Sequence, residues 1–144
     1  MTLRRSAARV LVVEDEPTIA LGLQLLLADW GYAVSGVAAT GEDALIAAAV
    51  EPPDLVIMDV RLDGRMDGIE TAAALRFQHT MPIVFLTAQS DPATVARLAA
   101  TDAGGVLYKP VEAARLQRLI GALVAPRPLP AAIAVGAPRV SRHL

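Results

Sequence analysis

Five short, strongly apolar runs recur along this chain, and each is followed by a stretch whose apolar residues have helical spacing. A near-continuous apolar run is typical of a strand that is buried on both faces. We predict strands over residues 9–13, 32–37, 54–59, 82–86 and 106–108. We predict helices over residues 17–30, 40–49, 69–78, 91–101 and 112–124. This alternation predicts an α/β fold with a five-stranded parallel sheet, helices on both faces and right-handed crossovers.

Charged and polar residues gather where four of the predicted strands end. They are Glu14, Asp15 and Glu16 after the first strand, Asp59 at the end of the third, Thr87 after the fourth and Lys109 after the fifth. The carboxyl ends of parallel strands share one edge of the sheet, and ligands bind in the crevice there. Each residue alone is also compatible with a structural role, such as acids at a helix N-terminus. Their common position indicates a site.

The composition limits the kind of protein. A length of 144 residues suits one domain with its own core, and only 3% aromatic residues make that core aliphatic. The chain has no cysteine, which excludes disulfides, thiolate zinc ligands and a catalytic thiol, and agrees with the cytoplasmic location that we expect. No apolar run approaches the length of a membrane span, and the apolar part of residues 1–13 is too short for a signal peptide. We therefore expect no membrane partner.

The charge is unevenly distributed along the chain. Six of the 13 basic residues are arginines before or at the start of the first strand and after the last helix, which leaves 7 against all 15 acids. An acidic body disfavours binding to nucleic acid and favours metal cations. Lys109 is the single lysine among the 13 basic residues, which suggests a need for a compact ammonium group there.

Carboxylates from two strand ends suggest a particular chemistry. Two such charges about 4 Å apart repel by roughly 4 kcal/mol at an effective dielectric near 20, and a hard cation such as Mg²⁺ relieves that repulsion. A carboxylate beside the ion can attack a phosphoryl group and form an acyl phosphate. An ammonium, a hydroxyl and a backbone N–H would share the charge of the transferring oxygens. The residues by themselves predict a Mg²⁺-dependent phosphoryl acceptor that uses an aspartate.

Four motifs in this order resemble the receiver domain of two-component response regulators. They are Val-Leu-Val-Val-Glu-Asp-Glu-Pro from residue 10, Leu-Val-Ile-Met-Asp from residue 55, Phe-Leu-Thr-Ala from residue 85 and Tyr-Lys-Pro from residue 108. The resemblance implies a flavodoxin-like, CheY-like (βα)5 fold over residues 9–125. Residues 1–8 would then be a basic N-terminal extension, and residues 126–144 a Pro/Ala-rich C-terminal tail.

The resemblance also implies the residues that bind metal and accept phosphate. Asp59 corresponds to the phospho-acceptor, and Asp15 to a direct Mg²⁺ ligand. Glu14 would reach the ion through water, and the backbone carbonyl of Arg61 would complete the metal site.

The remaining residues carried over belong to the phosphate side of the site. Thr87 corresponds to the switch hydroxyl, the backbone N–H of Ala88 to a phosphate donor, and Lys109 to the phosphate-binding lysine. The resemblance further implies a cis peptide bond between Lys109 and Pro110.

The chain departs from the family pattern near the fifth strand and after the third. The family usually carries an aromatic residue where this chain has Val106. Tyr108 projects from the same face of the strand, so the aromatic switch is either absent or displaced onto Tyr108. The alternative is that Tyr108 simply packs against the last helix. The loop from Asp59 to Gly68 is one residue longer than usual, and Arg61 lies where it would alter the lifetime of a phosphorylated state.

We expect a stand-alone receiver in a phosphorelay, which takes phosphate from a histidine kinase or phosphotransfer protein and signals to an unknown downstream protein. It would catalyse its own phosphorylation and dephosphorylation but would not be a metabolic enzyme. One alternative is a receiver fragment of a larger regulator or hybrid kinase. Another is a Mg²⁺-dependent phosphatase with an aspartate nucleophile, a class that needs a second acid where this chain has Arg61.

The tail is the least constrained part of the sequence. Residues 126–144 hold four prolines and no acid, a composition typical of a linker. The alternative is that residues 131–135 dock on a partner subunit. A homodimer would form through this tail or through the last helix–strand–helix face.

Overall fold

The computed structural model describes residues 7–124, so the predictions for residues 1–6 and for the tail lie outside the described residues. The strands are β1 (Arg9–Val13), β2 (Ala33–Ala38), β3 (Leu55–Asp59), β4 (Ile83–Thr87) and β5 (Gly105–Tyr108). The helices are α1 (Pro17–Asp29), α2 (Gly41–Val50), α3 (Gly68–Leu75), α4 (Pro92–Ala99) and α5 (Ala113–Leu123). Every predicted strand and helix is present, with ends that differ by a few residues.

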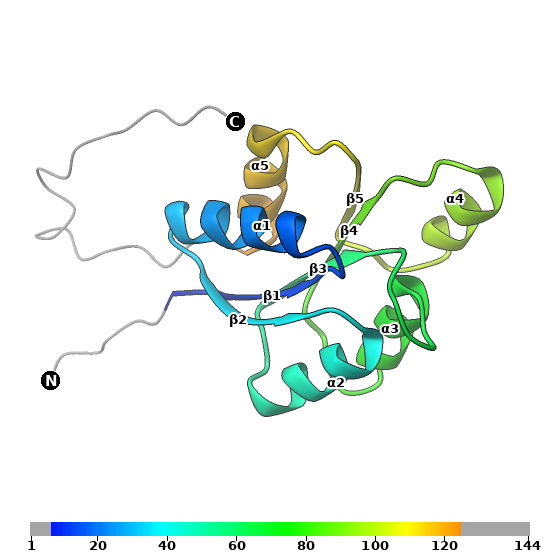
Figure 1. Cartoon of the computed structure of the whole chain (residues 1–144), viewed down its shortest axis with the longest axis horizontal. Coiled ribbons are helices and arrows are strands. Elements are labelled where there is room, and N and C mark those ends of the chain that lie inside the picture. Colours follow the sequence, from blue (N-terminus) through cyan, green and yellow to red (C-terminus); the bar gives the residue numbers. More distant parts are fainter. Residues whose placement is uncertain (1–6, 125–144) are drawn as a thin grey trace, which may run out of the picture.

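The strands form one parallel sheet in the order β2-β1-β3-β4-β5, with β3 at its centre. Helices α1 and α5 cover one face of this sheet, and α2 and α3 cover the other (Figure 1). Helix α4 belongs to the second face, because its Leu98 packs in the same apolar cluster as side chains of α2 and α3. The predicted parallel sheet with helices on both faces is therefore confirmed.

The central strand shows why the apolar runs are continuous rather than alternating. Val56 and Met58 pack in the cluster under α2 and α3, whereas Leu55 and Ile57 pack in the cluster under α1 and α5. All four side chains are essentially inaccessible to solvent. Since both faces of the strand are buried, every position from 55 to 58 needs an apolar residue.

The register of the strands brings their polar ends level with one another. Val13 pairs with Met58, so Glu14 lies beside the end of β3. Asp59 pairs with Leu86, and Thr87 pairs with Tyr108. The crossovers return every strand in the same direction, so these ends lie at one edge of the sheet.

Strand β5 lies at the edge of the sheet and places its side chains on alternating faces. Val106 packs in the cluster under α2 and α3, and Leu107 packs in the cluster that includes α5. Tyr108 follows Val106 by two positions and is 47% exposed. Leu107 rather than Tyr108 therefore faces α5, so the structure does not support a Tyr108 that packs against the last helix.

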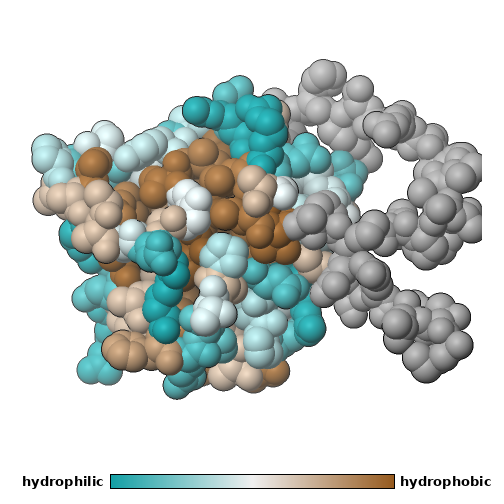
Figure 2. Space-filling view, turned by 180° about the vertical axis from the view of Figure 1, so that it is seen from behind, coloured by the Kyte–Doolittle hydropathy of each residue, from teal (hydrophilic) through white to brown (hydrophobic). Residues whose placement is uncertain are grey.

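The surface carries sizeable apolar area. Figure 2 shows a broad hydrophobic area, bordered by hydrophilic residues, on the side opposite to the view of Figure 1. Over the described residues, the exposed large apolar side chains are Leu21, Leu25, Val37, Ile46, Val50, Phe77, Val95 and Tyr108. These residues are spread over several helices and strands, and single exposed apolar side chains are common on protein surfaces. Among the helices formed by residues 7–124, none is both long and apolar enough to cross a membrane.

Candidate functional site

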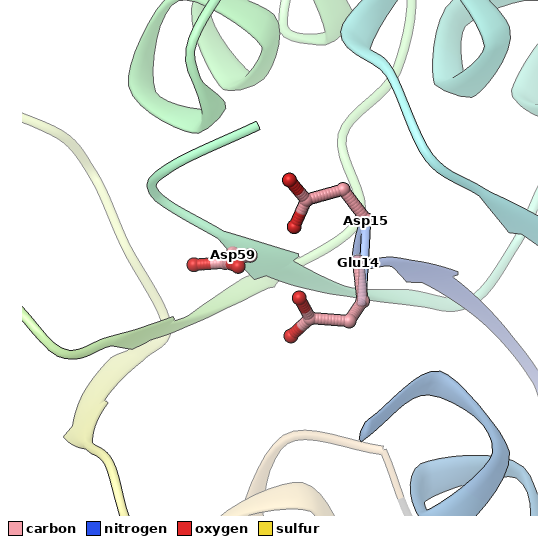
Figure 3. A group of neighbouring side chains, drawn as sticks. All are labelled: Glu14, Asp15 and Asp59. Atoms are coloured by element: carbon pink, nitrogen blue, oxygen red, sulfur yellow. The ribbon is translucent and has the colours of Figure 1, made fainter. Parts of the chain in front are cut away.

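Three acidic side chains converge at the carboxyl edge of the sheet. Glu14 and Asp15 directly follow β1, Asp59 ends β3, and their carboxylates point into one shared space (Figure 3). One carboxylate oxygen from each lies within 4.8 Å of the others. Glu14 is 3% exposed and Asp59 is 6% exposed, while Asp15 is half-buried. The structure therefore brings together the three predicted acids, as the register of β1 and β3 requires.

Lys109 crosses the same edge and pairs with two of these acids. Its Nζ atom lies 3.0 Å from Oε1 of Glu14 and 3.2 Å from Oδ2 of Asp59. Its backbone N–H donates a hydrogen bond to the carbonyl oxygen of Thr87, which continues the pairing of β5 with β4. The peptide bond between Lys109 and Pro110 is cis, as the resemblance implied.

The electrostatics of the cluster are dominated by its negative charge. The pKa of Glu14 is raised to about 7, chiefly by burial and also by the neighbouring Asp59, although the hydrogen bond from Lys109 lowers it. Burial lowers the pKa of Lys109, but the hydrogen bonds and charges of Glu14 and Asp59 outweigh burial, so the pKa is raised overall. One ammonium group is thus too little positive charge for three carboxylates, and the site favours an additional cation.

The donor set fits a magnesium ion. Carboxylate oxygens are hard ligands, and Mg²⁺ in proteins is commonly held by one or two carboxylates together with water and a phosphate oxygen. Asp15 is the carboxylate of this group that Lys109 does not engage, and it is partly open to solvent. Among the residues from 7 to 124, this is the group of acids whose oxygens converge closely enough to hold an ion.

The loop after β3 contributes backbone to the site. The N–H of Arg61 donates a 3.2 Å hydrogen bond to Oδ1 of Asp59, and the Arg61 side chain is exposed. The backbone of Arg61 therefore lies beside Asp59, where the resemblance placed a carbonyl ligand. The loop ends at Asp67, whose side chain accepts a hydrogen bond from the N–H of Glu70 and completes a capping box at the start of α3.

Thr87 and Ala88 occupy the end of β4, next to the strand that carries Asp59. Thr87 is fully buried, and its hydroxyl accepts a 2.9 Å hydrogen bond from the N–H of Gln89. The same hydroxyl donates a 3.5 Å hydrogen bond to the Gln89 carbonyl oxygen. Ala88 is exposed at the same edge. The hydroxyl is thus at the predicted strand end but is directed toward Gln89 rather than toward the acids.

Two contacts near the site were not found from the sequence. Arg97 of α4 forms a 2.8 Å ion pair with Asp67, and Gly68 packs against the backbone of Asp59. The dipeptide Asp67-Gly68 is a recognisable helix start, but no local pattern pairs Arg97 with it. Arg97 lies on α4 and Asp67 caps α3, so the distance between them depends on how the two helices pack.

Comparison with known proteins gives one consistent family. The family model described as the response regulator receiver domain matches residues 10–121. The transcriptional regulatory protein PdtaR of Mycobacterium tuberculosis is 43% identical over 100 residues, which are 69% of this chain and 47% of that protein. The transcriptional regulatory protein KdpE of the same species is also 43% identical, over 69% of this chain and 42% of that protein. The chain thus spans less than half the length of these relatives.

Solved structures agree with this result. The signal receiver domain of a modulated diguanylate cyclase from Desulfovibrio desulfuricans G20 superposes with a TM-score of 0.75 at 39% identity, and the match covers 80% of this chain and 91% of that one. The chemotaxis protein CheY4 of Vibrio cholerae superposes with a TM-score of 0.73 at 32% identity, over 81% of this chain and 98% of that one. Both neighbours have the fold described above.

Proposed function

Because this chain belongs to the response regulator receiver domain family, we propose that it accepts a phosphoryl group on Asp59 in the presence of Mg²⁺. The donor is a phosphohistidine of a histidine kinase or of a phosphotransfer protein. The observation that supports this most strongly is the position of Asp59, close both to the acids that follow β1 and to the ammonium group of Lys109. Both relatives named above are transcriptional regulatory proteins, which supports a role in signalling.

Asp59 is the best placed of the three acids to act as the nucleophile. Its Oδ1 atom accepts the hydrogen bond from Arg61, and its Oδ2 atom faces Lys109, so the carboxylate is held in a fixed orientation. In the transfer, one Asp59 oxygen forms a bond to phosphorus, and the bond from phosphorus to the histidine nitrogen breaks. The imidazole leaves with the electron pair of that bond, and Asp59 becomes an acyl phosphate.

Asp15, Glu14, Asp59 and the backbone carbonyl of Arg61 would hold the ion. Bound Mg²⁺ supplies positive charge that stabilises the oxygens of the transferring phosphoryl group. Asp15 supplies a carboxylate that is not paired with Lys109, and Glu14 contributes negative charge from a buried position. Glu14 also accepts a 3.3 Å hydrogen bond from the N–H of Glu16, which fixes its carboxylate at the end of β1.

Lys109 and Ala88 act on the incoming phosphoryl group. The ammonium group of Lys109 has three donors, of which two face Glu14 and Asp59 in the unphosphorylated protein. When Asp59 carries a phosphoryl group, Lys109 turns its donors toward the new oxygens, and the N–H of Ala88 donates from the end of β4. This charge-assisted contact stabilises the phosphorylated form.

Thr87 links phosphorylation to a change of shape. Its hydroxyl must leave Gln89 to reach a phosphoryl oxygen, and the loop between β4 and α4 moves with it. The added charge thus shifts a population toward a second conformation of the α4–β5–α5 face. The half-exposed Tyr108 lies at the end of β5 on this face and takes the place of the family's switch aromatic. A downstream protein, or a second copy of the chain, binds the new conformation.

Dephosphorylation returns Asp59 to its free form by hydrolysis. A water oxygen attacks phosphorus, the bond to the Asp59 oxygen breaks, and inorganic phosphate leaves. The backbone of Arg61 lies beside Asp59, and its side chain is exposed. This side chain controls how that water reaches phosphorus and therefore the lifetime of the phosphorylated state. We propose no metabolic substrate, because the chemistry of the site begins and ends with Asp59 itself.

The second candidate is a receiver domain that forms part of a longer regulator or hybrid kinase. The observation that favours it is the short span of the match, since the chain covers less than half of the named relatives. The chemistry at Asp59 is the same in both cases. An aspartate-based phosphatase is less well supported, because Arg61 stands where that class needs a second acid. We place the protein in the cytoplasm, where a phosphohistidine donor is accessible.

The test is phosphorylation by a small-molecule donor such as acetyl phosphate. We expect the full chain to incorporate one acid-stable, base-labile phosphoryl group in Mg²⁺ and none in EDTA. Asp59→Asn should abolish incorporation. Asp63→Asn is the matched control, because Asp63 is an exposed acid of the same loop that does not belong to the cluster. Equal labelling of Asp59→Asn and the parent would refute the proposal.

A further inference from the structure

An apolar groove runs between α1 and α5, on the face of the sheet opposite to α2 and α3. It has a volume of about 500 Å³ and is lined by Ile19, Leu23 and Leu26 of α1 and by Leu86, Val111 and Leu116. Lys109 and Pro110 form part of its rim, so the groove opens next to the acidic cluster. Figure 1 shows α1 and α5 side by side over the sheet. A groove of this size and lining can accommodate apolar side chains.

We propose that residues 131–135 of this same chain occupy the groove. This segment reads Ala-Ala-Ile-Ala-Val, so its side chains are small or aliphatic and carry no charge. It follows α5 in the sequence, and α5 forms one wall of the groove. The occupant is therefore already tethered beside the site that it fills, which lowers the entropic cost of binding.

The exit point of the chain supports this assignment. The hydroxyl of Tyr32 donates a 3.0 Å hydrogen bond to the carbonyl oxygen of Val124, immediately after α5. Tyr32 itself is buried in the apolar cluster that contains the groove residues Leu23 and Leu116. The chain thus leaves the domain from a fixed point on the face that carries the groove.

The length of the intervening segment is sufficient. The distance along α5 from Val124 back to Leu116 is about 12 Å, at 1.5 Å per residue. Residues 125–130 contain Pro126, Pro128 and Pro130, which favour an extended backbone. Six residues in that conformation would span about 19 Å, at 3.1 Å per residue. Residues 131–135 can therefore reach the groove if the chain turns back along α5.

The charged residues that follow residues 131–135 also favour a chain that runs back along α5. A chain that runs from the end of α5 back toward its start would carry Arg139 and Arg142 to the carboxyl edge of the sheet. That edge carries Asp15 and the exposed Glu16 in addition to the buried Glu14 and Asp59. The tail has no acidic residue that would oppose this approach. Opposite charges thus meet when the apolar segment is in the groove.

Docking would also cover the rim at Lys109 and Pro110. Any effect of the tail on phosphoryl transfer rests on the proposed function, whereas the docking itself can be tested without phosphate. Failure of one is therefore distinguishable from failure of the other.

The test uses engineered disulfides, since the natural chain has no cysteine. Gly22 lines the groove, and a β-carbon added there meets no atom within 4 Å. The pair Gly22→Cys and Ala134→Cys in the full chain should oxidise with diamide to an intramolecular disulfide. Ala134 is chosen because Ile133 and Val135 then remain as anchors. A disulfide forms only when the two α-carbons approach to roughly 4.4–6.8 Å.

The matched control is the pair Gly121→Cys and Ala134→Cys. A β-carbon at Gly121 also has open space, but Gly121 is an exposed residue of α5 outside the groove. It is closer to Ala134 in sequence, so a tail without a preferred position would link to it faster. We expect the Gly22 pair to oxidise at least tenfold faster, and Leu26→Glu within the groove to remove that preference. Circular dichroism verifies that each variant is folded.

Two results would overturn the proposal. Equal or faster oxidation of the Gly121 pair would place the tail elsewhere. Disulfides that form only between molecules, and whose yield rises with protein concentration, would assign the groove to a second copy of the chain.

Discussion

Gly68 packs directly against the backbone of Asp59. A β-carbon built on Gly68 would lie 2.8 Å from the carbonyl carbon of Asp59 and would overlap its carbonyl oxygen. The N–H of Gly68 also donates a 2.7 Å hydrogen bond to the carbonyl oxygen of Val60. The first turn of α3 therefore holds the end of β3, and with it the candidate phospho-acceptor, in place.

We predict that Gly68→Ala destabilises the protein by about 1–3 kcal/mol, because the added methyl group overlaps backbone atoms that cannot move aside. Chemical denaturation measures the free energy of unfolding. Gly121→Ala is the matched control: it lies within α5 with open space around the added carbon, and it should gain up to about 1 kcal/mol of stability. Similar free energies for both variants would show that Gly68 is not sterically required.

The titration of Glu14 predicts how stability depends on pH. Its pKa rises from 4.5 to about 7 on folding, chiefly because the carboxyl group is buried. Between these two values the folded state keeps a proton that the unfolded state has lost, so stability falls as the pH rises. We predict that the metal-free protein loses on the order of 1–3 kcal/mol of stability between pH 5 and pH 7.5.

Denaturation in EDTA across this pH range measures the effect. Glu14→Gln serves as the reference, because it keeps the shape of the side chain and removes its titration. The free energy of unfolding of the parent, relative to that of Glu14→Gln, should fall as the pH rises from 5 to 7.5. A difference that stays constant from pH 5 to pH 7.5 would show that Glu14 does not titrate in this window.

The cluster also predicts which acid matters for Mg²⁺. Asp15 shares the acidic cluster and is not paired with Lys109, so Asp15→Asn should weaken Mg²⁺ binding at least tenfold, a loss of about 1.4 kcal/mol or more. Isothermal titration calorimetry measures the affinity. Glu16→Gln removes the same charge at an exposed neighbour outside the cluster and should change the affinity much less. An equal loss in both variants would indicate general electrostatics rather than coordination.

We predict that the ion pair between Arg97 and Asp67 stabilises α4 locally. Asp67 raises the pKa of Arg97 through its hydrogen bond and its charge, and α4 buries only Thr94 and Leu98. Because the pair is partly exposed, Arg97→Ala should cost no more than about 1 kcal/mol of global stability. Amide hydrogen exchange should nevertheless accelerate in α4 and remain unchanged in α5. Arg118→Ala, an exposed arginine of α5, is the control that should leave α4 unaffected.

Much of the fold follows from local pattern. The apolar runs that end in Asp59 or precede Glu14 identify two-face-buried strands, and their polar ends identify the edge that carries the site. The three acids were predicted together because parallel strands share one carboxyl edge. Lys109 was placed at this edge for the same reason, and its ammonium group lies there.

Other features depend on distances that no sequence pattern contains. The pairing of Lys109 with the buried Glu14 links the residues that directly follow β5 and β1, two strands that are not neighbours in the sheet. The contact of Arg97 with Asp67 depends on how α4 packs. The hydroxyl of Thr87 was predicted at the right strand end, but its turn toward Gln89 reflects a local hydrogen bond that competes with the site.

The most direct test of phosphoryl transfer to Asp59 is to identify which residue carries the phosphoryl group. The full chain is phosphorylated with acetyl phosphate and Mg²⁺ and then treated with borohydride, which reduces an aspartyl phosphate to homoserine, and the peptides are sequenced by mass spectrometry. We predict homoserine at position 59 and at no other aspartate. Homoserine at Asp15 or elsewhere, or a folded protein in which Asp59 is unchanged, would contradict it.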